Sequence, residues 1–224
     1  MDSPVAQRIR ELIVEGVLPP GSRVAEATIA ERLGVSRTPV RSALPALASE
    51  GLLEPAGKRG YAVRNFTVED SYRATEVRCL LEGYAARELA SRSDRHPIVA
   101  SLRQVLVEGD AIFAKGHVEL ADEEAYATMN GRFHGLIVGG ARDPLLTDLV
   151  HRVYSVPFVA PNVVASNRIP LDEIYPILLS GHRQHHAIVD AIEGGQADVA
   201  DTLMRGHSTP ARRTLGLEGG RAQE

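Results

Sequence analysis

Three histidines surrounded by apolar residues at helical spacing are the first candidates for chemistry in this sequence. His134, His185 and His207 each fall on or beside the apolar face of a predicted helix when residues are placed about 100° apart. Asn130 lies one turn before His134, on the same edge of its helix. Imidazoles that converge inside a helical bundle are a common way to build a metal site. The positions predict either a divalent metal site or buried histidines that form hydrogen bonds with their neighbours.

A second pair of histidines competes for a role in metal binding. His182 and His186 are four residues apart in one predicted helix, a spacing that suits zinc. They fall toward the flank of the apolar face of that helix. We therefore expect them to lie at the surface or at the edge of a cavity.

Arg78 is a candidate contact for an anionic ligand. The helix around it carries large apolar side chains and is predicted to be mostly buried: Val77, Leu80, Leu81 and Tyr84. A guanidinium in such a segment predicts either a contact with the carboxylate of an effector or an ion pair with Glu82, four residues on.

A separate group of polar residues marks the start of a short predicted helix near the N-terminus. Ser36 is a suitable N-cap, and Arg37, Thr38 and Arg41 follow within the first turns. An arginine at the start of a helix in the major groove can bind guanine O6 and N7 together. A serine, a threonine and the backbone N–H groups of a helix start suit phosphate. The alternative is that both arginines are simply solvated.

The elements around this helix follow the order of a winged helix-turn-helix. Helical spacing predicts one helix that ends at Gly16, a second over residues 25–33, and a third from Ser36 to Gly51. The third helix is expected to enter the major groove. Pro45 lies inside it and removes one helix hydrogen bond, so a kink is expected beyond the end that meets the DNA.

Two short predicted strands complete this N-terminal region. They cover residues 52–54 and 61–63. Lys58, Arg59 and Gly60 lie in the turn between them, which we expect to contact the DNA backbone or the minor groove.

From residue 67 onward the pattern is helical, and we find no convincing strand. Helices are predicted over residues 67–89, 97–114, 118–139, 144–156, 171–193 and 196–214. The fold class is therefore mostly α, with a winged helix-turn-helix in residues 1–66 and an all-α helical bundle in residues 67–217. Residues 218–224 are polar and Gly-rich, and we expect a disordered tail.

The composition is that of a globular protein, with 44% hydrophobic and 24% charged residues. The single cysteine, Cys79, excludes an internal disulfide framework and a multi-cysteine zinc site. No apolar run approaches the roughly 20 residues that span a bilayer, so a cytoplasmic protein without a membrane partner is expected. The net charge is −4, which argues against a protein that coats nucleic acid along its whole surface.

The N-terminal motifs resemble the DNA-binding domain of GntR-type transcription regulators. The resemblance is carried by residues 16–21 and 29–41, with Glu26 between them, and continues through residues 51–53 and 59–60. It implies that the Ser36-Arg37-Thr38 cluster contacts DNA.

The second half resembles the FCD domain, the all-helical ligand-binding domain of the FadR-like branch of that family. The resemblance is carried by residues 76–82, by Phe133-His134, by His185 ahead of Ala191-Ile192, and by His207. Many FCD domains bind a divalent metal through three histidines and one aspartate, which implies zinc or a similar ion at His134, His185 and His207. Asn130 occupies the aspartate position here, and a neutral amide oxygen is a weaker ligand for a hard cation.

The sequence therefore predicts a regulator that represses transcription and whose DNA affinity responds to a small-molecule effector, an organic acid. The resemblance implies a homodimer on a palindromic operator in double-stranded DNA. A metalloenzyme is disfavoured, because the chain has no His-Glu-x-x-His, Gly-x-Ser-x-Gly or P-loop motif. The alternative that stays open is a dimeric DNA-binding protein without a working effector site.

Overall fold

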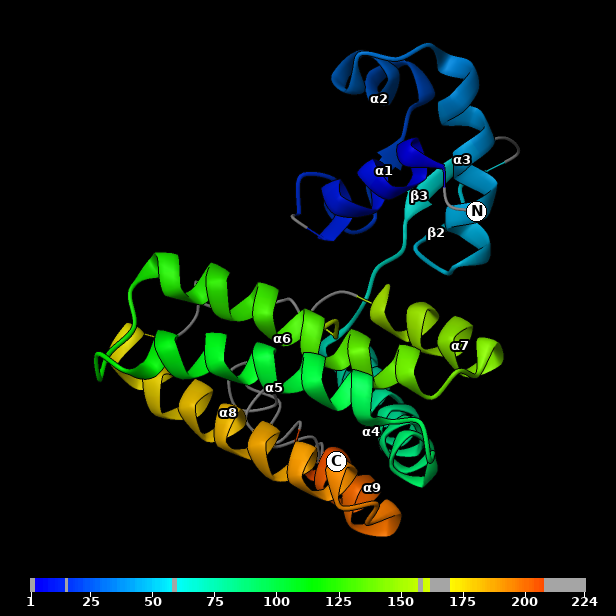
Figure 1. Ribbon diagram of the computed structural model, residues 1–224. Helices are drawn as coiled ribbons and strands as arrows, with labels where there is room; N and C mark the ends of the chain where they lie inside the picture. The colour runs from blue at the N-terminus through cyan, green and yellow to red at the C-terminus, as the bar shows by residue number, and fades with distance from the viewer. Residues whose placement is uncertain (1–2, 15, 58–59, 157–158, 162–169, 208–224) are drawn as a thin grey trace, which may run out of the picture. The chain divides into compact units, whose positions relative to one another are not determined.

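The structure, a computed structural model, describes residues 3–14, 16–57, 60–156, 159–161 and 170–207 (Figure 1). The described residues form α-helices and one small antiparallel sheet, which confirms the mostly α fold class. The chain divides into two compact units between Thr67 and Val68, and the first unit also takes in the short segment from Ser155. Residues 208–224, with the expected tail and the end of the last predicted helix, lie outside the described residues.

In the described residues of the first unit there are three helices and one three-stranded sheet. Its elements are α1 (Pro4–Val14), β1 (Arg23–Val24), α2 (Glu26–Leu33), α3 (Arg37–Ser49), β2 (Leu53–Pro55) and β3 (Tyr61–Val63). The strand order is β1-β3-β2, and both pairings are antiparallel. The sequence predicted the three helices and the hairpin of β2 and β3. It missed β1, because a strand of two residues carries no periodicity.

A tight turn sets α3 against α2. Gly34 ends α2 in the left-handed conformation, with a φ of 66°, and its N–H faces the carbonyls of Ala30 and Glu31. A side chain at this position would be strained, so glycine makes the abrupt turn possible. Ser36 then has the extended backbone of an N-cap, and α3 begins at Arg37. The helix continues through Pro45 to Ser49, so the proline does not end it.

Apolar side chains from all three helices and from the sheet hold the first unit together. Ile9 of α1, Ile29 of α2 and Leu47 of α3 are fully buried, as is Leu52 just before β2. Burial of each such side chain contributes about 1.5–3 kcal/mol. The exposed face of α3 is thus fixed by apolar contacts on its opposite face.

The second unit is a bundle of six helices among the described residues. They are α4 (Val68–Ser91), α5 (His96–Phe113), α6 (Leu120–Gly140), α7 (Pro144–Tyr154), α8 (Leu171–Glu193) and α9 (Ala197–Gly206). Helix α5 runs beside both α6 and α8, and α9 packs along α4 (Figure 1). The core lies between these helices and includes Leu89, Leu102, Phe133 and Ile188. None of the described helices is long and apolar enough to cross a membrane.

The orientation of α4 differs from the prediction. Val77, Leu80 and Tyr84 were expected to be buried, but 46%, 51% and 44% of their surfaces are exposed. The buried face of α4 carries Arg78 and Glu82 instead, with exposed fractions of 6% and 3%. Leu81, the fourth residue of that prediction, is partly buried and packs against the core. The pattern misled at the other three positions because the paired Arg78 and Glu82 occupy the inward face there.

Candidate metal, effector and DNA-binding sites

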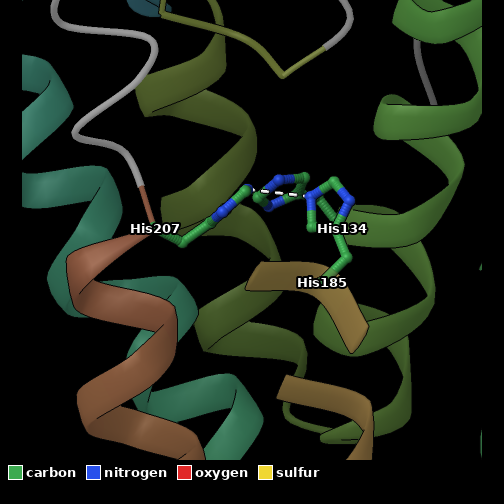
Figure 2. Close-up of side chains that lie close together, drawn as sticks. All are labelled: His134, His185 and His207. Atoms are coloured by element: carbon green, nitrogen blue, oxygen red, sulfur yellow. Dashed lines mark hydrogen bonds between the residues drawn. The ribbon is translucent and has the colours of Figure 1, made fainter. Parts of the chain in front are cut away.

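Three histidine rings meet inside the bundle (Figure 2). His134 comes from α6, His185 from α8, and His207 directly follows α9. All three are buried, and one ring nitrogen of each lies within 4.8 Å of the others. The Nε2 atoms of His185 and His207 face each other at 2.8 Å. Three elements that are distant in the sequence thus bring three nitrogen ligands to one place.

The surroundings keep these imidazoles neutral. Burial lowers the pKa of His134, and burial with the neighbouring histidines lowers the pKa values of His185 and His207 well below the ordinary value. Neutral imidazole is the form that binds a metal, since a protonated ring has no free lone pair. Metal binding therefore requires no net loss of charge from the rings, only movement of the proton that lies between His185 Nε2 and His207 Nε2.

Hydrogen bonds outside the cluster orient two of the rings. His134 Nδ1 lies 3.0 Å from a carboxylate oxygen of Glu82, and His207 Nδ1 lies 3.1 Å from Gln184 Oε1. Each of these contacts needs the proton on Nδ1, which leaves the lone pair on Nε2. Histidines that bind metals are held in this way by carboxylate or carbonyl acceptors. Sequence analysis did not identify Gln184, which has no signal beyond its place beside His185.

Asn130 supplies a fourth polar group near His134. Its Nδ2 donates to the carbonyl of Pro161 at 2.6 Å. Its Oδ1 and the Nδ1 of His185 are buried and have no hydrogen-bond partner among the described residues. A buried amide oxygen without a partner is costly unless it finds a ligand. Three neutral nitrogens and this oxygen fit the donor set of zinc or a similar divalent ion.

Arg78 lies beside the cluster but is already paired. Its Nε donates to Glu82 Oε1 at 2.9 Å, and one terminal nitrogen donates to the carbonyl of Val159 at 2.8 Å. Its other terminal nitrogen lies 3.3 Å from His134 Nε2. Although burial acts to raise the pKa of Glu82, Arg78 and His134 hold it well below its usual range. The ion pair that the sequence offered as an alternative is therefore present.

The predicted DNA-contacting residues of α3 share one exposed surface. Ser36, Arg37, Thr38 and Arg41 are all exposed at the start of the helix. The Arg37 side chain is 67% exposed and approaches Glu26 of α2 at 3.4 Å. Weak pairing with a neighbouring carboxylate leaves the guanidinium available to another acceptor.

The turn between β2 and β3 is described only in part. Gly60 is exposed, and its carbonyl accepts a hydrogen bond from the N–H of Ala56 at 3.0 Å. Lys58 and Arg59, the two basic residues predicted to contact DNA there, lie outside the described residues.

His182 and His186 form a second cluster, which adjoins the first where the rings of His182 and His185 lie 5.9 Å apart between centroids. His182 and His186 meet Asp110 of α5. His182 is 2% exposed, which rules out the surface but not the cavity edge, the other position expected for it; His186 is partly exposed. Sequence analysis missed Asp110, because its proximity depends on how α5 and α8 are aligned.

Comparison with known proteins agrees with both halves of the chain. The model of the family described as "Bacterial regulatory proteins, gntR family" matches residues 2–63, and that of the FCD domain matches residues 73–209. A protein of Paenarthrobacter nicotinovorans, "Probable D-xylose utilization operon transcriptional repressor", is 32% identical over 91% of this chain and 85% of its own length. The "Gluconate operon transcriptional repressor" of Bacillus subtilis is 27% identical over 84% of this chain and 74% of its own length.

A solved structure shares the fold. The solved structure of E. coli McbR/YncC superposes with a TM-score of 0.73 over 96% of both chains at 19% identity. At this identity the likeness concerns the fold alone, but the two family matches cover most of the sequence. The chain belongs to the GntR family of bacterial transcription regulators and carries a C-terminal FCD domain.

Proposed function

We propose that this regulator is a repressor whose affinity for DNA falls when an organic acid binds to a divalent metal held by His134, His185, His207 and Asn130. The observation that carries the proposal is the convergence of three buried imidazoles, one ring nitrogen of each lying within 4.8 Å of the others. Beside them, His185 Nδ1 and Asn130 Oδ1 are buried without a hydrogen-bond partner among the described residues, which is costly unless they meet a ligand.

The charge of the site explains why the metal and the acid depend on each other. Arg78 and Glu82 cancel, the three imidazoles are neutral, and Asn130 is an uncharged amide. The bound ion would bring the whole net charge of the site. A buried charge without a counter-ion is unfavourable, so a carboxylate that reaches the ion is strongly favoured. One relative is named for a gluconate operon, and gluconate belongs to this class of acid.

DNA recognition is assigned to the start of α3. Arg37 and Arg41 would contact base edges or phosphates, and Ser36, Thr38 and the turn at Lys58, Arg59 and Gly60 would contact the backbone. In a dimer, each chain would present one such helix to one half of a palindromic operator. An effector that shifts the two DNA-binding units relative to each other would change how well they fit the operator.

The His185→Gln variant tests the metal and the effector together. Glutamine removes one imidazole, so we expect the buried site to lose its zinc and the protein to stop responding to the acid. The measurement is release of the full chain from an operator selected from random DNA, with zinc and a panel of hydroxy acids that includes gluconate. His151→Gln, at an exposed histidine of α7, is the control. The proposal is contradicted if the acids release the His185→Gln variant from the operator as well as they release the unchanged chain. It is also contradicted if D-xylose alone causes release.

A homodimer is supported by the apolar stripe on α4. Val77, Leu80 and Tyr84 are spaced to lie on one side of the helix, and each is more than 40% exposed. Exposed apolar stripes of this kind are typical of protein interfaces.

We expect Leu80→Asp to convert the dimer into a monomer, because it places a charge inside the apolar contact. Light scattering coupled to size exclusion gives the mass. The control is Val107→Asp, which changes a 66% exposed valine of α5. A mass that is the same for Leu80→Asp, Val107→Asp and the unchanged chain argues against this interface.

A further inference from the structure

A second group of metal-binding side chains lies where α5 packs on α8. Asp110 of α5 and the pair His182 and His186 of α8 place one ligand atom each within 4.8 Å of one another. Both histidines direct Nε2 toward the same carboxylate oxygen, Asp110 Oδ1, at 2.9 Å each. Three potential ligands therefore already surround a single point.

Packing holds one of these ligands in place. The ring of His182 lies over Gly109, where a Cβ atom would come within 2.1 Å of the imidazole. Phe113 covers it at a ring-centroid distance of 5.4 Å. The glycine thus leaves a space that the imidazole fills, and the buried ring is aimed at Asp110. The Nδ1 atom of His182 has no hydrogen-bond partner among the described residues, so the contact of Nε2 sets the orientation of the ring.

The other two ligands can adjust. The Asp110 side chain is 55% exposed and that of His186 is 37% exposed. Bonds from zinc to imidazole nitrogen and carboxylate oxygen are about 2.0–2.2 Å long, so the three atoms must separate slightly to admit an ion. Rotation of two side chains at the surface achieves this without moving the buried ring. Water can then fill the remaining coordination position, as it does in other sites with three protein ligands.

We propose that Asp110, His182 and His186 form a second divalent metal site that links α5 to α8 and is separate from the buried three-histidine cluster. Two imidazoles and one carboxylate favour zinc, nickel or cobalt over magnesium or calcium, which prefer oxygen alone. The spacing of four residues within a helix, with the third ligand from the neighbouring helix, suits this chemistry. The site rests on residues that the proposed effector site does not use, so either can fail without the other.

Zinc content of the purified full-length chain tests the second site. After dialysis against a zinc buffer, we expect two equivalents per chain in the unchanged protein. We expect one equivalent in His186→Gln, one in Asp110→Asn and one in His185→Gln, which removes a ligand of the other site. The controls are His151→Gln and Asp148→Asn, which alter exposed residues of α7. Both controls should retain two equivalents.

Thermal unfolding separates loss of the ligand from loss of the fold. Zinc should raise the melting temperature of His185→Gln but not that of a His185→Gln/Asp110→Asn double variant, because only the former can still bind an ion that links two helices. The proposal is overturned if the unchanged chain binds no zinc, if its zinc is lost entirely in His185→Gln, or if either His186→Gln or Asp110→Asn retains the wild-type content.

Discussion

We expect the Arg37→Ala variant to lose the ability to select a specific DNA sequence. Arg37 is the first residue of α3, and its side chain is 67% exposed. A bidentate contact with guanine contributes about 1–3 kcal/mol of discrimination. A dimer on two half-sites would lose about 2–6 kcal/mol, or roughly 30-fold to 20,000-fold in specific affinity. Binding to unrelated DNA should change far less, because phosphate contacts dominate it.

Selection from a random DNA pool measures this effect directly. The unchanged chain should enrich a short palindrome that the Arg37→Ala variant does not enrich. The matched control is Arg132→Ala, which removes an arginine of α6 whose side chain is 52% exposed. If Arg37→Ala weakens all sequences equally and still enriches the same palindrome, Arg37 contacts phosphate instead of a base, and the proposed role in base recognition is wrong.

The sequence allowed most helices to be predicted because their apolar spacing extends over many turns. The prediction for α8, residues 171–193, coincides with its observed bounds Leu171–Glu193. The prediction failed where polar chemistry replaces apolar packing. In α4 the side chains of Val77, Leu80 and Tyr84 are exposed, whereas Arg78 and Glu82 face inward because each is the other's partner and both adjoin His134. Periodicity counts apolar residues and cannot identify an ion pair that satisfies itself inside the bundle.

The candidate sites were also predictable to different degrees, because periodicity describes one helix at a time. Each of His134, His185 and His207 lies on or beside an apolar face, so its inward position can be deduced from its own helix. The contact between Asp110 and His182 depends on the alignment of two helices and on the space above Gly109. No feature of either helix alone contains that information. A site shared between elements becomes visible only when their packing is known.

The Asn130→Asp variant should change metal binding and effector binding in opposite directions. Aspartate has the shape of asparagine but would place a negative charge beside the ion. Two unit charges 4 Å apart attract by about 4 kcal/mol at an effective dielectric constant of about 20, and the cost of burying the carboxylate offsets part of this. We therefore expect the variant to bind zinc roughly 10- to 100-fold more tightly than the unchanged chain. Competition for zinc between the protein and a chelating dye would measure this affinity.

The same charge should weaken the response to an organic acid. Because the three imidazoles are neutral and Arg78 is paired with Glu82, the ion is the main attraction for an anion, and an aspartate would cancel part of it. A higher concentration of acid should then be needed to release the protein from its operator. Asn65→Asp, which adds the same charge at an exposed position, should leave both quantities unchanged.

The opposite outcome has a distinct signature. If His134, His185 and His207 only form hydrogen bonds with their neighbours, Asn130→Asp buries a carboxylate without a cation to pair with it. The variant would then melt at a lower temperature, and zinc would not restore its stability. If zinc raises the melting temperature of Asn130→Asp more than that of the unchanged chain, residue 130 must reach the ion. The asparagine would then be the feature that keeps metal affinity modest while it leaves the full charge of the ion for the effector.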